Sequence, residues 1–182
     1  MDIEPTSPGG APDSSRLRIP SGGVLAGLVC GLLGGAVLGA IYAHIGAWIP
    51  VFCLPVPVFL GWGIGAACGL GSRLGGRLGP WTGRALGTVS GLAAMYAAWV
   101  FWILALSRYG VLVVSPAALH RTIGHLAENG VWTVRGHTPK DGELLLVWIV
   151  ELAVVVLVSA GAAGMYCEER EHERRTDDSR VF

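Results

Sequence analysis

The sequence predicts an all-α fold: an integral membrane four-helix bundle with a short amphipathic helix in its outer loop. Of the 182 residues, 52% are hydrophobic and 14% are charged, whereas a typical soluble domain carries about 25% charged residues. The charges are also segregated. No Asp, Glu, Lys or Arg lies between positions 18 and 73 or between 84 and 108, and Glu151 is the single one between 143 and 168. Apolar runs of about 20 residues have the length needed to cross a bilayer.

Four such runs are expected to be transmembrane helices, at about residues 22–46, 51–71, 85–106 and 144–166. The preceding residues, 1–20, are rich in Pro, Gly and Ser and lack the apolar region of a cleaved signal peptide, so we expect a disordered tail. Few residues separate the first two runs, which therefore form a tight helical hairpin. The final residues, 167–182, are expected to form a charged cytoplasmic tail.

The positions of Lys and Arg predict the orientation in the membrane, because cytoplasmic loops carry an excess of positive charge. With the N-terminus inside, nine of the 13 basic residues fall on the inner side and four on the outer side. The inner set is Arg16, Arg18, Arg73, Arg77, Arg84, Arg170, Arg174, Arg175 and Arg180, and the outer set is Arg108, Arg121, Arg135 and Lys140. This distribution predicts a multi-pass protein with both the N-terminus and the C-terminus in the cytoplasm.

The outer loop, residues 107–142, is long enough to hold structure of its own. Ser115 followed by Pro116 is typical of a helix start, and Asn129 followed by Gly130 is typical of a helix end. Between these signals, apolar residues recur at helical spacing at Leu119, Ile123 and Leu126. We therefore expect a short amphipathic helix that lies at the outer membrane surface.

Glycine recurs every fourth residue, which places it on one slowly winding stripe of a helix. The first span carries Gly23, Gly27, Gly31, Gly35 and Gly39, and the second carries Gly61, Gly65 and Gly69. Small residues let transmembrane helices approach closely. The stripes therefore predict packing of the first span on the second, with a homo-oligomeric interface or a glycine-lined pore as alternatives. The repeat continues from Gly71 to Gly83, where Arg73, Arg77 and Pro80 favour a flexible inner loop.

Glu151 is the main candidate for a functional side chain. It lies roughly 12 Å into the fourth span, at 1.5 Å per residue, where a charged carboxylate costs a few kcal/mol. It must therefore be protonated, paired or in contact with a wet cavity. Candidate partners are His44, at the outer end of the first span, and Tyr96 and Arg108, associated with the third. Glu151 could be a proton-linked or substrate-binding carboxylate, or a hydrogen-bonded clamp that fixes helix register.

The remaining polar residues do not form a recognisable catalytic or metal motif. His120 and His125 are five positions apart, whereas zinc ligands on one helix face are four apart, so we expect these residues and His137 to be surface histidines. Cys30, Cys53, Cys68 and Cys167 include no C-x-x-C pair and are expected to pack as small apolar residues. We therefore expect no metal, no cofactor and no enzymatic activity, and the zero net charge gives no reason to expect a nucleic-acid partner.

Several short patterns together resemble a group of uncharacterised bacterial four-span membrane proteins to which no activity is assigned. They are Tyr42 with Ile49-Pro50, the Gly61–Gly65 region, Tyr96 with Trp99, Pro116 with Gly130-Val131-Trp132, and Gly142-x-Leu144-x-x-x-Trp148-x-x-Glu151. The resemblance implies a location in the bacterial inner membrane. Proteins of this group carry paired cysteines after the last span, whereas here Cys167 is followed three positions later by Arg170.

Two functions of different classes follow from these features. The first is a structural or interaction protein whose partners are the lipid bilayer and, through the glycine stripes, further copies of the chain. The second is a small transporter or channel-like component that uses Glu151. An enzyme is not expected, because one carboxylate without a nucleophile or metal set is too little for catalysis.

Overall fold

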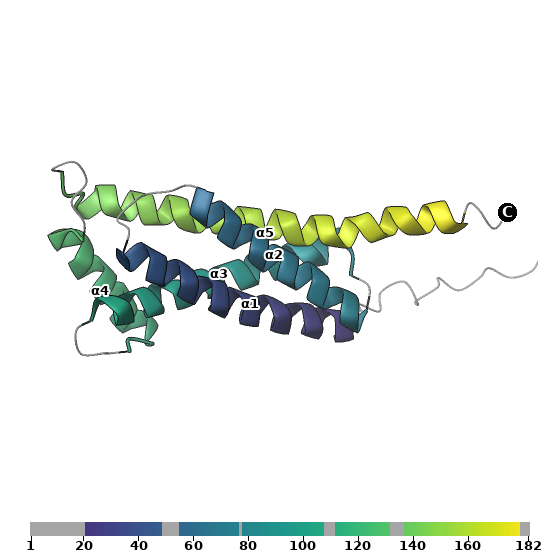
Figure 1. The fold of residues 1–182 in the computed structure, drawn as a ribbon, viewed down its shortest axis with the longest axis horizontal. Coiled ribbons are helices and arrows are strands. Elements are labelled where there is room, and N and C mark those ends of the chain that lie inside the picture. The colour runs from purple at the N-terminus through teal and green to yellow at the C-terminus, as the bar shows by residue number, and fades with distance from the viewer. Residues whose placement is uncertain (1–20, 49–54, 77, 108–111, 132–136, 179–182) are drawn as a thin grey trace, which may run out of the picture.

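The computed structural model describes residues 21–48, 55–76, 78–107, 112–131 and 137–178, and these residues form five helices. The helices are α1 (Ser21–Trp48), α2 (Pro55–Gly75), α3 (Pro80–Leu106), α4 (Pro116–Asn129) and α5 (Asp141–Asp178). Four of them, α1, α2, α3 and α5, are long and apolar enough to cross a membrane, and they pack together side by side (Figure 1). This arrangement confirms the predicted all-α, four-span fold. The tail predicted at residues 1–20 lies outside the described residues.

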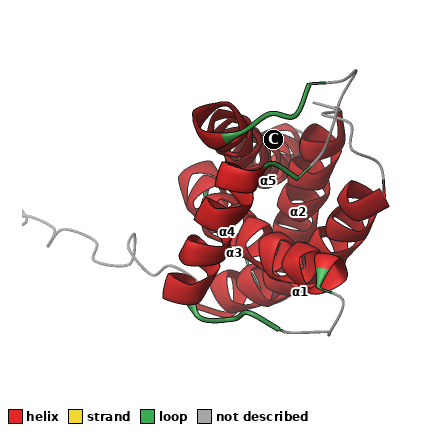
Figure 2. Cartoon of the chain, turned by 90° about the vertical axis from the view of Figure 1, so that its left-hand side faces the viewer, coloured by secondary structure: helices red, strands yellow, loops and turns green. Residues whose placement is uncertain are grey.

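The middle helices α2 and α3 separate α1 from α5. Helix α1 packs along both α2 and α3, and α5 packs along the same two helices, whereas α2 and α3 touch each other over a shorter length. The view along the bundle shows this arrangement (Figure 2). Each outer helix therefore has a buried side toward the α2–α3 pair and a free side.

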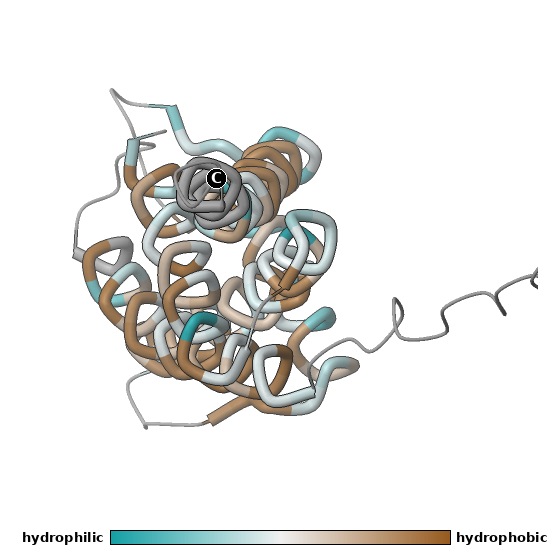
Figure 3. Tube along the Cα trace, turned by 90° about the vertical axis from the view of Figure 1, so that its right-hand side faces the viewer, coloured by the Kyte–Doolittle hydropathy of each residue, from teal (hydrophilic) through white to brown (hydrophobic). Residues whose placement is uncertain are grey.

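The free sides of the outer helices are apolar. On α1, large aliphatic residues recur every fourth position and are 45–64% exposed: Leu25, Val29, Leu33, Val37 and Ile41. On α5, Leu146, Ile149 and Leu157 are 61–71% exposed. In Figure 3, which looks along the bundle, many helical turns are coloured brown, for hydrophobic residues. Surfaces of this kind require hydrocarbon rather than water around them, so the bundle contacts the lipid bilayer.

The two ends of the bundle differ. At one end, which we call the tail end, the start of α1 meets the end of α2, because Gly22 and Gly75 lie in backbone contact. The start of α3 and Cys167 of α5 lie at the same end, where Gly83 adjoins Cys167. The opposite end, which we call the capped end, carries α4 (Figure 1).

The sequence-based boundaries of the second and third spans need correction. Helix α2 begins at Pro55, where missing proline N–H groups cost no helical hydrogen bond, and it continues to Gly75 rather than ending at 71. Helix α3 begins at Pro80, five residues before the predicted start, with Gly79 as an extended N-cap. The predicted flexible loop between Gly71 and Gly83 is therefore wrong, because helix ends occupy most of it.

Helix α5 is longer than the predicted last span. It begins with Asp141 and Glu143 in its first turn, where negative charge is favourable beside the helix N-terminus. The candidate membrane span covers Asp141–Glu168, and the same helix runs on to Asp178. This extension projects beyond the other helices (Figure 1).

The short helix predicted between the third and fourth spans is confirmed as α4, Pro116–Asn129, preceded by Ser115 in an extended conformation. Its apolar side packs on the protein: Leu119 and Ala127 are buried in one cluster with Trp102 of α3 and Trp148 of α5. The rings of Trp102 and Trp148 meet edge to face, with centroids 5.8 Å apart. Helix α4 therefore caps the bundle.

Candidate functional site

The glycine stripe of α1 lies in the groove between α2 and α3. At the tail end, a Cβ on Gly23 would lie 3.0 Å from the Gly76 oxygen and one on Gly27 would lie 3.2 Å from the Cys68 oxygen. Farther along, a Cβ on Gly35 would lie 2.8 Å from Ala94 Cβ, and one on Gly39 would lie 2.9 Å from the Ala94 oxygen. The absence of side chains thus allows backbone contact between α1 and both of its neighbours.

The stripe on α2 faces a different helix. A Cβ on Gly61 would lie 2.7 Å from the Val155 oxygen, and one on Gly65 would lie 2.7 Å from Ala162 Cβ. Gly69 adjoins Tyr166, which is also on α5. The first span does pack on the second within the chain, because Gly23 and Gly27 of α1 lie against α2. The stripe of α2, however, faces α5 and not the stripe of α1.

Small polar side chains connect the helices inside the bundle. The Cys68 thiol of α2 donates to Ser90 Oγ of α3 across 3.1 Å. Ser159 Oγ of α5 donates to the Gly87 carbonyl of α3 across 2.9 Å, and Ser159 is fully buried. Ser72 Oγ and Cys167 Sγ lie 3.8 Å apart between α2 and α5. Interhelical bonds of this type help to hold transmembrane helices in one register.

Arginines occupy the tail end of the bundle. The Arg73 guanidinium donates to the Tyr166 carbonyl across 3.0 Å and lies 5.3 Å from the centre of the Tyr166 ring. The Arg84 guanidinium lies 4.9 Å from the centre of the Trp81 ring. Cations over aromatic rings are favourable at a membrane–water boundary, where the aliphatic stem stays in the apolar region.

Tyr42 of α1 and Glu151 of α5 lie near each other. Tyr42 and Leu152, the neighbour of Glu151, both pack against the buried cluster that contains Leu60, Ile64 and Met95. This proximity connects the two helices that α2 and α3 otherwise keep apart. Tyr42 is therefore the partner that the sequence analysis missed. The sequence feature that could have identified Tyr42 is its phenol group within an apolar span, because a buried phenol needs a hydrogen-bonding partner.

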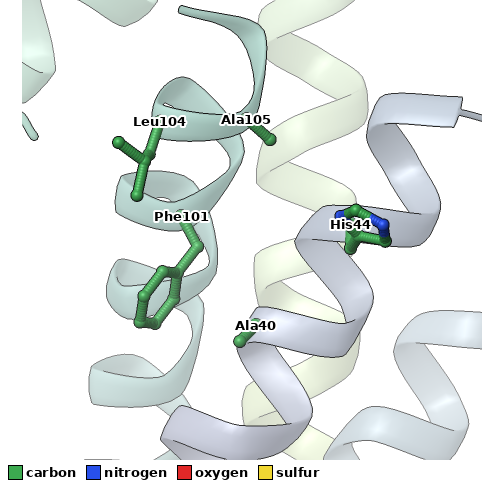
Figure 4. A pocket seen from close by; sticks show the side chains of 5 residues that line it. All are labelled: Ala40, His44, Phe101, Leu104 and Ala105. Atoms are coloured by element: carbon green, nitrogen blue, oxygen red, sulfur yellow. The ribbon is translucent and has the colours of Figure 1, made fainter. Parts of the chain in front are cut away.

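Two of the three predicted partners, Tyr96 and His44, have other surroundings in the structure. Tyr96 Oη donates to the Val114 carbonyl, which precedes α4. His44 is exposed and lines a hollow of about 200 Å³ between α1 and α3, together with Ala40, Phe101, Leu104 and Ala105 (Figure 4). Arg108 lies outside the described residues.

The histidines of the segment between α3 and α5 lie at the surface of the capped end. His137 Nε2 lies 2.9 Å from Glu143 Oε2, and both side chains are more than half exposed. His125 Nδ1 lies 3.9 Å from Glu128 Oε2, one turn along α4. Within the described parts of the chain, no group of three or more His, Cys, Asp or Glu residues is arranged to hold a metal ion.

No family model, curated protein or solved structure matches the chain. The resemblance inferred from short sequence patterns is thus supported only in its coarse feature, a multi-pass membrane protein with four candidate spans.

Proposed function

We propose that the chain is a non-enzymatic interaction protein of the bacterial inner membrane, with both termini in the cytoplasm. The bundle would serve as a rigid membrane anchor that presents the end of α5 to a cytoplasmic partner protein. One observation carries this proposal: α5 is a single helix whose candidate membrane span ends at Glu168 and which continues to Asp178.

The close packing of the bundle supports a role as an anchor. Helix contacts at the glycine positions Gly23, Gly39, Gly61 and Gly65 involve backbone atoms of the neighbouring helix. Packed interiors of this kind resist deformation. A continuous helix leaving such a bundle holds its far end in a defined direction, which suits binding to a partner better than a free tail does.

The arginines support the cytoplasmic location of the tail end. Arg73 and Arg84 lie there beside aromatic rings, and the sequence from 169 to 178 adds Arg170, Arg174 and Arg175. The positive-inside rule places an end with this excess of arginine in the cytoplasm. The sequence of the extension contains no aliphatic residue between 169 and 178, which favours a partner in water over one in lipid.

Assembly of several copies through the α1 stripe is less well supported than an interaction with another protein. The stripe contacts α2 and α3 of its own chain, so a second copy could reach it only if the bundle opened. The aliphatic free side of α1 is suited to lipid.

The experiment is site-specific photocrosslinking in native membranes, with the photoreactive residue at position 170 or 174. The control position is Leu157, which is 71% exposed on the free side of the same helix. We expect a discrete protein adduct from positions 170 and 174 and lipid adducts from 157. Absence of a protein adduct at both extension positions, in protein shown to be membrane-inserted, would contradict the proposal.

The position of Glu151 inside the candidate span of α5 and near Tyr42 favours a second candidate, a small transporter or channel-like component. Intramembrane carboxyl groups mark ion and proton pathways in many transporters. Replacement Glu151→Gln preserves shape and removes the ionisable group. Unchanged insertion together with an unchanged cellular phenotype would exclude this candidate, whereas normal insertion with loss of the phenotype would support it.

A further inference from the structure

At the tail end of the bundle, the side chain of Arg84 is held in position by two neighbours. A Cβ built on Gly164 of α5 would lie 2.7 Å from Arg84 Cγ and 2.9 Å from Arg84 Nε, so the stem of the arginine lies directly over that glycine. The guanidinium lies 4.9 Å from the centre of the ring of Trp81, three residues earlier on α3. Arg84 is therefore a positioned cation, although it is exposed on the surface of the bundle.

The charge of Arg84 is not offset by a carboxylate among the residues that the structure describes. Helices α1, α2 and α3 contain no Asp or Glu. On α5, the first acidic residue beyond Gly164 is Glu168, and no ion pair or hydrogen bond with a described residue occupies the Arg84 guanidinium. Arg73, in contrast, donates to the Tyr166 carbonyl. The donors of the Arg84 guanidinium are thus available to a ligand.

An apolar face continues from this arginine along the membrane-spanning part of α3. Its members are exposed and recur at helical spacing: Trp81, Ala85, Val89 and Leu92. Trp81 is 77% exposed at the start of the candidate span, and aromatic rings favour the level of the lipid headgroups. The surface therefore presents a cation at the membrane boundary, followed by a strip of apolar side chains. A phospholipid presents its phosphate and its acyl chains in the same order.

The chemistry of the guanidinium favours an anionic phospholipid over a zwitterionic one. A planar guanidinium pairs with phosphate oxygens in a bidentate geometry. The headgroups of phosphatidylcholine and phosphatidylethanolamine carry their own ammonium group, whereas that of phosphatidylglycerol does not. Because no carboxylate offsets Arg84, a lipid with net negative charge balances it best. An arginine that is already held in position also loses less conformational freedom when the lipid binds.

We propose that Arg84 and Trp81 form a binding site for an anionic phospholipid. The phosphate lies against the guanidinium, and the acyl chains lie along the exposed face of α3. Gly164 is a positioning residue, because its lack of a side chain leaves room for the stem of Arg84. The site is separate from the extension of α5 that is proposed to bind a protein, and it does not depend on which side of the membrane the tail end faces.

The test is native mass spectrometry of the full-length chain in detergent micelles with phosphatidylglycerol or phosphatidylcholine of identical acyl chains. We expect the native chain to bind phosphatidylglycerol several-fold better, and Arg84→Gln to lose this preference. The matched control is Arg121→Gln, because Arg121 is an exposed arginine of α4 at the capped end. Equal binding of the two lipids by the native chain, or equal losses in the two arginine variants, would overturn the proposal.

Replacement Gly164→Ala tests the position of the arginine without a change in charge. The added methyl group would overlap the stem of Arg84, which can move aside, so we expect a folded protein with several-fold weaker phosphatidylglycerol binding. Gly161→Ala is the control, because nothing lies within 4 Å of a Cβ built there. Unchanged binding in the Gly164 variant would contradict the site. Release of the lipid by millimolar inorganic phosphate would also contradict it, because the ligand would then be a free anion.

Discussion

Gly31 of α1 and Cys68 of α2 meet at the centre of the helix packing. A Cβ built on Gly31 would overlap Cys68 Sγ. The same atom would lie 3.0 Å from the Cβ of Ser90 of α3. The Cys68 thiol already donates to Ser90 Oγ. Gly31 thus lies where three helices converge, and the lack of a side chain there is what allows the Cys68–Ser90 bond to form.

Replacement Gly31→Ala is expected to destabilise the bundle. The added methyl group must displace Cys68 or Ser90, and overpacking of this kind costs about 1–3 kcal/mol. The matched control is Gly161→Ala, because Gly161 also lies in a membrane-spanning helix yet has nothing within 4 Å of a built Cβ. Thermal unfolding in detergent should show a lower midpoint for the first variant and an equal or higher one for the second. Equal midpoints for both variants would contradict the packing at Gly31.

Replacement Ser159→Ala removes the bond from Ser159 Oγ to the Gly87 carbonyl between α5 and α3. Interhelical hydrogen bonds in membranes contribute about 0.6–1.7 kcal/mol, so we expect a loss of stability in that range. Thr88→Ala is the control, because Thr88 Oγ1 bonds within its own helix to the Arg84 carbonyl and is exposed. Denaturation in mixed micelles measures the free energy of unfolding of both variants. A larger effect for Thr88 than for Ser159 would refute this role of the serine.

Replacement Trp148→Ala should loosen the capped end. Trp148 is buried beneath α4 and meets Trp102, and truncation of a buried aromatic residue costs about 3–5 kcal/mol. Trp62, which is 50% exposed on α2, gives the matched control Trp62→Ala. With protease added on the side of the membrane where α4 lies, cleavage within α4 should be faster in the Trp148 variant than in the native protein. The rate in the Trp62 variant should be unchanged. Equal protection of the two variants would show that the tryptophan pair does not support the cap.

Replacement Tyr96→Phe should loosen the segment that precedes α4, because the Tyr96 hydroxyl bonds to the Val114 carbonyl. A hydrogen bond contributes about 0.5–1.5 kcal/mol net. Hydrogen exchange followed by mass spectrometry should therefore be faster in residues 112–119, with the amides of α2 as the internal reference. Unchanged exchange in that segment would show that the bond does not hold it.

The spans could be predicted from the sequence because bilayer thickness and the cost of buried charge act on composition alone. Their ends could not. Helix α3 begins at Pro80, and Arg84 lies only four residues farther along it. An arginine near a helix end can extend its side chain to the membrane boundary, so its charge does not mark where the helix starts. Helix α5 passes Tyr166, where hydropathy falls, because helical hydrogen bonding does not require apolar side chains.

The candidate site shows a different limit of sequence reasoning. Glu151 stands out in the sequence as a lone carboxyl group in an apolar run, but its partner depends on which helices adjoin. The short loop between the first two spans gave no sign that α1 would pack on α3 as well as α2, nor that the α2 stripe would face α5. Tyr42 reaches Glu151 only in that arrangement, and depth along the span alone favoured His44.

The most direct test of the account is a disulfide between α1 and α2 within one chain. A Cβ on Gly34 would lie 3.0 Å from Ala67 Cβ, close to the separation of about 3.5–4.5 Å found in disulfides. In a background without the native cysteines, the double variant Gly34→Cys, Ala67→Cys is oxidised in native membranes. The account predicts an internally crosslinked monomer, with no dimer from Gly34→Cys alone. Dimers linked through position 34, without the internal crosslink, would contradict it.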